Sequence, residues 1–163
     1  MKNNTNKGEA YKLVLSNLKS CGNSNDIFHL IGLIAACESI MSDRLSAFLE
    51  GTKNLEYKKK LLKNKNGLSF GNLLECSKEE LEKELKPIKG IEEIETKNLY
   101  AEIYTWKDMR NQIIHAVCKS KNKITHKSER VLFAEAQCAC LNGYRLVRLL
   151  LKWNSKTKRE NNK

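Results

Sequence analysis

Hydrophobic residues recur along most of the chain at intervals of three and four residues, which places their side chains on one face of an α-helix. The pattern predicts helices over residues 8–20, 26–50, 55–62 and 128–153, and another from residue 91 or 96 to residue 118. Residues 26–50 are apolar over the widest arc, as is typical of a helix at the centre of a bundle. The expected fold is all-α: an antiparallel helical bundle of four or more helices with short additional helices.

Turn and capping signals set the expected helix boundaries. One of residues 24–26 can cap the second predicted helix, and Gly51 ends it. A short apolar turn is expected around residues 73–74. Ser77-Lys-Glu-Glu80 has the spacing of a capping box, so it predicts an acidic helix that continues to about residue 86 and closes at Pro87.

Length and composition favour one compact helical protein. The 163 residues are 40% hydrophobic and 30% charged, with one proline and eight glycines. We expect a single domain over residues 1–163, with flexible polar ends at about 1–7 and 154–163. The N-terminus has no apolar region typical of a signal peptide, and the apolar run 27–41 is too short to span a bilayer. A cytoplasmic location without a membrane partner is therefore expected.

The charge balance points to a polyanionic partner. The formal net charge is +11 and the pI is about 9.4. Nucleic acid is the first candidate, an anionic membrane surface the second, and a merely solubilising surface the alternative. Residues 53–65, 119–130 and the C-terminal tail are basic, whereas residues 75–95 are net acidic.

The cysteines do not indicate a metal site. The six cysteines lie mostly within apolar helical patterns, and we expect buried thiols in place of disulfides. Cys138 and Cys140 would diverge by roughly 200° on a helix, and the chain has no Cys-x2-Cys pair. We therefore expect no metal and no cofactor.

Residues 106–118 carry the candidate chemistry. Their apolar face is formed by Trp106, Met109, Ile113, Ile114 and Val117. Arg110, Asn111 and His115 fall outside that face. Arginine is a permanent cation that binds phosphate, and histidine transfers protons near neutral pH. This combination suits work on a phosphodiester.

Helical spacing decides which of these residues can meet. Asn111 and His115 are four residues apart, so the amide can orient the imidazole. Trp106 and Arg110 have the same spacing, so the indole can pack against the guanidinium stem. Arg110 and His115 are separated by roughly 140° around the helix axis and are not neighbours. A symmetric dimer with these helices face to face would bring two Arg/His sets into one groove.

The stretch Arg110-Asn111-Gln-Ile-Ile-His115 resembles the Arg-(polar)-x3-His signature of HEPN domains. The apolar helix around residues 35–45, with its embedded Glu38, is also similar to the early helix of that family. The resemblance implies a homodimeric all-α domain, often a metal-independent endoribonuclease of toxin–antitoxin, abortive-infection, CRISPR-linked or RNA-processing systems. It makes His115 the catalytic histidine, Arg110 the phosphate-binding partner and Asn111 the polar orienting residue. Glu38 would orient His115 or pair with Arg110.

The expected function is a homodimeric endoribonuclease with a composite Arg/His site and a toxin–antitoxin or phage-defence role. RNA is the expected partner, and an antitoxin encoded nearby would be a second. Supporting RNA contacts are assigned to the basic loop that follows His115, at Lys119, Lys121, Lys123 and His126. One alternative is a non-catalytic HEPN module that binds RNA or a protein, for example a nucleotidyltransferase-type antitoxin. Another is a structural dimer whose motif only stabilises its interface.

Overall fold

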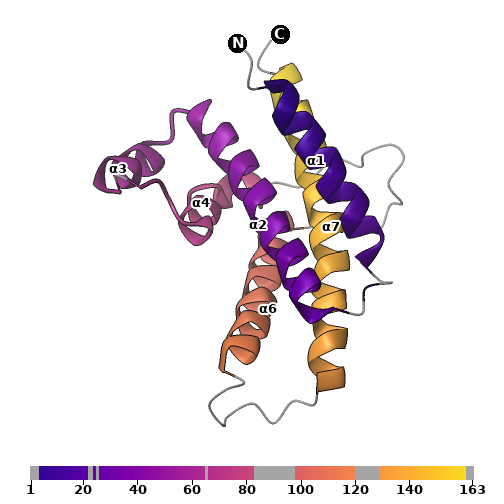
Figure 1. The fold of residues 1–163 in the computed structure, drawn as a ribbon. Helices are drawn as coiled ribbons and strands as arrows, with labels where there is room; N and C mark the ends of the chain where they lie inside the picture. The colour runs from indigo at the N-terminus through magenta and orange to yellow at the C-terminus, as the bar shows by residue number, and fades with distance from the viewer. Residues whose placement is uncertain are drawn as a thin grey trace. The chain divides into compact units, whose positions relative to one another are not determined.

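The computed structural model describes residues 4–21, 24, 26–64, 66–82, 98–119 and 129–160. These residues form seven helices and no strand, so the all-α prediction is confirmed for this part of the chain (Figure 1). The helices are α1 (Asn4–Lys19), α2 (Ile27–Glu50), α3 (Leu55–Lys63), α4 (Phe70–Cys76), α5 (Lys78–Leu81), α6 (Leu99–Lys119) and α7 (Glu129–Glu160).

The boundaries of α2 follow the predicted turn chemistry, and α3 also begins at a capping residue. The Asp26 side chain accepts a hydrogen bond from the backbone N–H of Phe28 at 2.8 Å, and α2 ends immediately before Gly51. Asn54 caps α3 by accepting from the backbone N–H of Tyr57 at 2.8 Å. Both caps satisfy donors that the first turn of a helix leaves free.

The predicted capping box at Ser77 is wrong. Ser77 is buried, its backbone is helical at φ −96° and ψ 0°, and its side chain makes no capping hydrogen bond. Its hydroxyl instead donates to the Leu73 carbonyl at 2.9 Å. Residues 73–74, which we predicted to form an apolar turn, lie within helix α4. Because the Ser77 hydroxyl is bonded to α4, it cannot cap the helix that follows. The remainder of the predicted acidic helix, from residue 83, lies outside the described residues.

Helix α7 is longer than predicted. We expected it to end near Trp153, yet it continues to Glu160. The added residues contain neither glycine nor proline, and extending an existing helix costs far less free energy than starting one. Two large apolar residues of α7 are exposed, Val131 at 46% and Leu141 at 50%.

The chain divides into two compact units. Unit 1 contains residues 1–40 and 106–163, and unit 2 contains residues 41–105. The expectation of a single domain over the whole chain stays a prediction. None of the helices, over the described residues, is long and apolar enough to cross a bilayer.

Unit 1 is built around α7. Helix α1 runs beside it (Figure 1). From α6, the buried Trp106 donates its indole N–H to the Ala139 carbonyl at 2.8 Å. From α2, the Leu30 carbonyl accepts from the Cys140 thiol at 3.3 Å. Hydrogen bonds from two helices therefore meet adjacent residues of α7.

Gly143 lets these helices approach closely. A Cβ atom at this position would lie 2.8 Å from Cys37 Sγ and 3.1 Å from Trp106 Nε1. Both distances are shorter than ordinary van der Waals contact, so a side chain at this position would force Cys37 or Trp106 to shift.

Unit 2 is held by polar bonds around a small core. The Asn54 amide donates to the Cys76 carbonyl at 2.9 Å and so ties the start of α3 to the end of α4. The Tyr100 hydroxyl donates to Glu75 at 2.6 Å, and the Lys78 ammonium lies 5.3 Å from the centre of the Tyr100 ring. Burial, together with the bond to Glu75, raises the pKa of Tyr100.

All six cysteines are free thiols, and the predicted burial holds for four of them. Cys21, Cys37, Cys76 and Cys140 are buried, whereas Cys118 and Cys138 are exposed. Burial raises the pKa of Cys37 to about 12, with a smaller contribution from the nearby Cys21, and it also raises the pKa of Cys140. Because the thiolate is the reactive form, both burial and pKa protect the inner thiols.

Replacing Gly143 with alanine should destabilise the protein by about 1–3 kcal/mol, because the added methyl group overlaps Cys37 and disturbs the Trp106 bond. Gly32→Ala is the control: its Cβ meets nothing within 4 Å, and alanine favours a helix by about 1 kcal/mol. Urea unfolding of both variants measures the difference. Equal stability of the two variants would contradict the close packing at Gly143.

The thiols should divide into two classes in the native protein. No more than two of the six should react rapidly with iodoacetamide at neutral pH, and all six should react after unfolding in urea. Mass spectrometry of the labelled peptides identifies them. Rapid native labelling of Cys37 or Cys140 would show that the core of unit 1 is open.

Candidate functional site

Helix α6 carries the Arg-Asn-x3-His motif on a well-packed frame. Trp106 and Ile113 are buried, and Met109, Ile114 and Val117 are half-buried. The predicted apolar face is therefore the face that packs. The Trp106 bond to α7 fixes α6 one helical turn before Arg110, so the motif starts from an anchored position.

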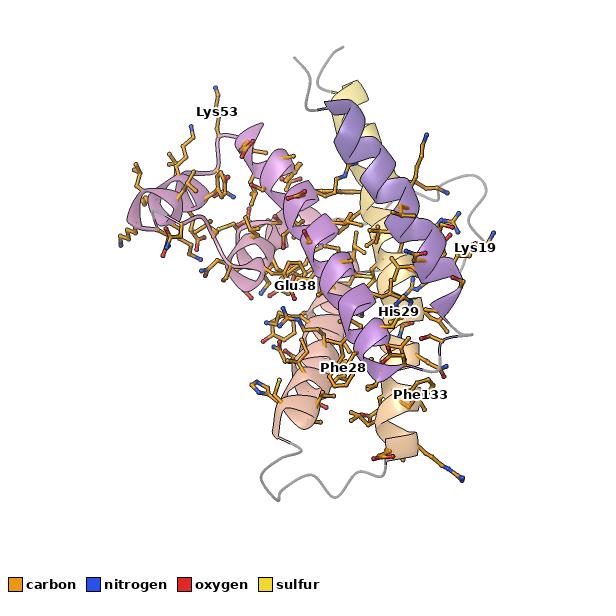
Figure 2. All side chains as sticks on the ribbon, in the orientation of Figure 1. Lys19, Phe28, His29, Glu38, Lys53 and Phe133 are labelled. Carbon is orange, nitrogen blue, oxygen red and sulfur yellow. The ribbon has the colours of Figure 1, made fainter. Side chains whose placement is uncertain are left out.

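Arg110 is directed towards α2 and is held there by charge. Its Nη2 forms an ion pair with Oε2 of Glu38, which lies on α2 facing α6 (Figure 2). The side chains of Arg110 and Glu38 are 24% and 21% exposed. Of the two arrangements expected for Glu38, the pairing with Arg110 is the one present. Because both groups are largely removed from water, losing one leaves the other poorly solvated.

Asn111 provides the second contact to the guanidinium. Its Oδ1 accepts from Arg110 Nη1 at 2.5 Å. The sequence predicted that this amide would orient His115, but the described residues show it bonded to Arg110. Arg110 Nε is buried and has no hydrogen-bond partner among the described residues. The ion pair with Glu38 at Nη2 and the hydrogen bond to Asn111 at Nη1 thus hold the guanidinium at two of its nitrogens.

His115 lies in solvent. Its side chain is exposed, and the described residues offer it no hydrogen bond or ion pair. Arg110 is turned towards α2, whereas His115 is open, in agreement with the separation of roughly 140° expected around one helix. The structure does not bring the two together within one chain.

Of the basic loop after the motif, only Lys119 is among the described residues. Lys119 is the last residue of α6, and its side chain is not described. Lys121, Lys123 and His126 lie outside the described residues, so their assignment as RNA contacts stays a prediction. Among the described residues no group of three or more His, Cys, Asp or Glu side chains could hold a metal ion.

Sequence reasoning missed the packing that positions the site. Cys37 and Gly143 have no polar chemistry and were not singled out, yet they bring α2, α6 and α7 together beside Glu38 and Arg110. A glycine inside an apolar helix is the one signal that could have indicated this, since it weakens the helix unless another element needs the space.

Comparisons of the chain with protein-family models, with curated proteins and with solved structures find no match.

A double-mutant cycle with Glu38→Ala and Arg110→Ala should give a coupling energy of about 1–2 kcal/mol, because the pair is more buried than surface pairs but not fully desolvated. The Glu56–Lys60 pair of α3, at 2.9 Å, is the matched control. Its more exposed side chains should couple by only about 0.3–0.5 kcal/mol. Urea unfolding measures all the variants. If the two cycles agree, Glu38 does not hold Arg110 in solution.

Proposed function

We propose that this protein is a metal-independent endoribonuclease of the HEPN type that acts as a homodimer. The observation that carries the proposal is the motif on α6: a guanidinium fixed by Glu38 and Asn111, followed five residues later by an exposed histidine. Arg110 would bind the scissile phosphate and His115 would transfer protons. The HEPN-like bundle and the membership of that family are part of the same proposal.

The chemistry needs only the groups that the motif offers. His115 would take the proton of the ribose 2′-hydroxyl as its oxygen attacks phosphorus. The bond from phosphorus to the 5′-oxygen breaks, and that oxygen receives a proton, which leaves a 2′,3′-cyclic phosphate and a 5′-hydroxyl end. Arg110 would stabilise the negative charge that builds on the phosphoryl oxygens. Its fixed plane lowers the entropy lost when phosphate binds.

The geometry of α6 supports the proposed dimer. Arg110 faces α2 and His115 faces solvent, so a single α6 offers no groove that contains both. A second copy with its α6 opposite the first would place two arginines and two histidines around one groove. Each copy carries a net charge of +11, so two copies repel each other. A polyanion bound in the groove would offset this repulsion.

A role in the cytoplasm within a toxin–antitoxin or phage-defence system follows from the resemblance to HEPN domains. RNA would be the substrate, and a neighbouring antitoxin would restrain cleavage. Supporting contacts to the RNA backbone would come from the basic loop after α6.

One observation favours the non-catalytic alternative. Glu38 neutralises much of the charge on Arg110, which weakens its attraction for phosphate. A module that binds RNA or a protein partner would tolerate this pairing better than a nuclease. Measuring binding and cleavage separately distinguishes the two.

The purified protein should cleave single-stranded RNA in the presence of EDTA, and His115→Ala should lower the rate by about 100-fold or more because the proton-transfer group is lost. His29→Ala is the matched control, since His29 is also an exposed histidine, on α2 (Figure 2), and should leave the rate unchanged. Gel analysis of labelled RNA measures the rate, and the cyclic-phosphate ends identify the chemistry.

The same proteins separate the alternatives. Equal RNA binding by wild type and His115→Ala, with no cleavage by either, would establish the binding module. If Arg110→Ala dissociates the dimer and RNA binding is absent throughout, the motif is structural. Sedimentation velocity reports the oligomeric state in each case.

A further inference from the structure

Helix α3 in unit 2 exposes large apolar side chains that the proposed nuclease site does not use. Leu62 is 86% exposed and Leu55 is 70% exposed. The helix is not loose: Tyr57 is only 4% exposed, and its hydroxyl lies 3.5 Å from Ser46 Oγ. The burial of Tyr57 and the hydrogen bond from Asn54 to Cys76 anchor one side of α3. Leu55 and Leu62 lie on the other side.

The positions around the helix axis are ordered. At roughly 100° per residue, Leu55 and Leu62 lie within roughly 20° of each other and roughly 140–160° from Tyr57. Lys58 borders the pair on one side, and Lys59 and Lys63 border it on the other; all three are exposed. We call the surface formed by Leu55, Lys58, Lys59, Leu62 and Lys63 the leucine–lysine face.

The charges next to this face add to its positive potential. Glu56 lies to the side of the face and is paired with Lys60 at 2.9 Å. Lys53, just before α3, is exposed and extends away from the ribbon (Figure 2). The face is thus an apolar centre with cationic borders.

Three kinds of occupant fit this face poorly. A second copy of the same face would oppose lysines to lysines. A protein partner needs about 800 Å² on each side, whereas a helix of nine residues is about 13 Å long and about 10 Å wide, which is several-fold too small. Single-stranded RNA binds through phosphates and through stacking on aromatic rings, and the aromatic residue of α3, Tyr57, is buried.

An anionic lipid surface fits both the charge and the size of the face. Leucines at the centre can enter the boundary between headgroups and acyl chains, and lysines on both borders can reach the phosphates with their flexible stems. A bilayer needs no complementary pocket, so a small face is sufficient. The sequence led us to expect no membrane partner, and the absence of a spanning helix among the described residues does not test surface attachment. We propose that the leucine–lysine face of α3 attaches the protein peripherally to membranes rich in anionic phospholipid.

Sedimentation of the full-length protein with vesicles tests this. Binding to vesicles of phosphatidylcholine with phosphatidylserine should exceed binding to phosphatidylcholine alone and should fall as salt is raised. Leu55→Ser with Leu62→Ser should lower the partition coefficient about tenfold or more, because the apolar contribution is lost. Lys58→Gln with Lys59→Gln and Lys63→Gln should remove the preference for anionic lipid.

Leu13→Ser is the control, since Leu13 is an exposed leucine (64%) on α1 in unit 1 and should not affect binding. If the double leucine variant does not fold by circular dichroism, Leu62→Asn alone replaces it and should lower binding severalfold. Absence of vesicle binding by wild type, or unchanged binding by the leucine variants, overturns the proposal. Loss of RNA binding in the lysine variant without any vesicle binding would assign the face to RNA. Cleavage by the α6 motif is measured separately and does not depend on the result.

Discussion

The close approach of three helices at Gly143 is the constraint on which the candidate site depends. Cys37 and Trp106 both lie against this glycine, and Trp106 is bonded to Ala139 one turn earlier on α7. Glu38 follows Cys37 directly, and Arg110 lies one turn after Trp106. The close packing at Gly143 therefore helps to set the distance between the charged groups of Glu38 and Arg110.

Local signals in the sequence predicted the helices and several of their ends. The three- and four-residue spacing identified α2 and α3 almost to the residue, and Asp26 and Gly51 bound α2 as their chemistry requires. The prediction of a capping box at Ser77 was wrong because the same sequence also allows the Ser77 hydroxyl to donate to the Leu73 carbonyl of the preceding turn. Ser77 is buried next to α4, and a local sequence pattern does not indicate that burial. The end of α7 failed for a related reason, because a polar sequence without glycine or proline contains no stop signal.

The candidate site was predictable in its residues but not in its contacts. The motif named Arg110, Asn111 and His115, and periodicity separated them from the apolar face. Residue spacing does not indicate which helix faces Arg110. The sequence therefore allowed Glu38 either to orient His115 or to pair with Arg110. Asn111 illustrates the limit most clearly. A separation of four residues makes contact with His115 geometrically available, but the adjacent guanidinium is charged and fixed by α2, and it takes the amide oxygen.

The pairing of Arg110 with Glu38 also bears on how a phosphate could bind. Glu38 contacts the guanidinium at Nη2, and Asn111 accepts a hydrogen bond from Nη1. Because a guanidinium has five N–H donors, an incoming phosphate can make contact without displacing the carboxylate. It must, however, approach a group whose charge is partly neutralised, and that approach is favourable only if additional positive charge surrounds the phosphate. Among the described residues, the group paired with Arg110 is the carboxylate of Glu38. A second α6 would bring another arginine and a histidine able to carry a proton, which restores the positive field. The ion pair therefore favours a composite site if the protein cleaves RNA as proposed, since a lone Arg110 held by Glu38 would bind phosphate weakly.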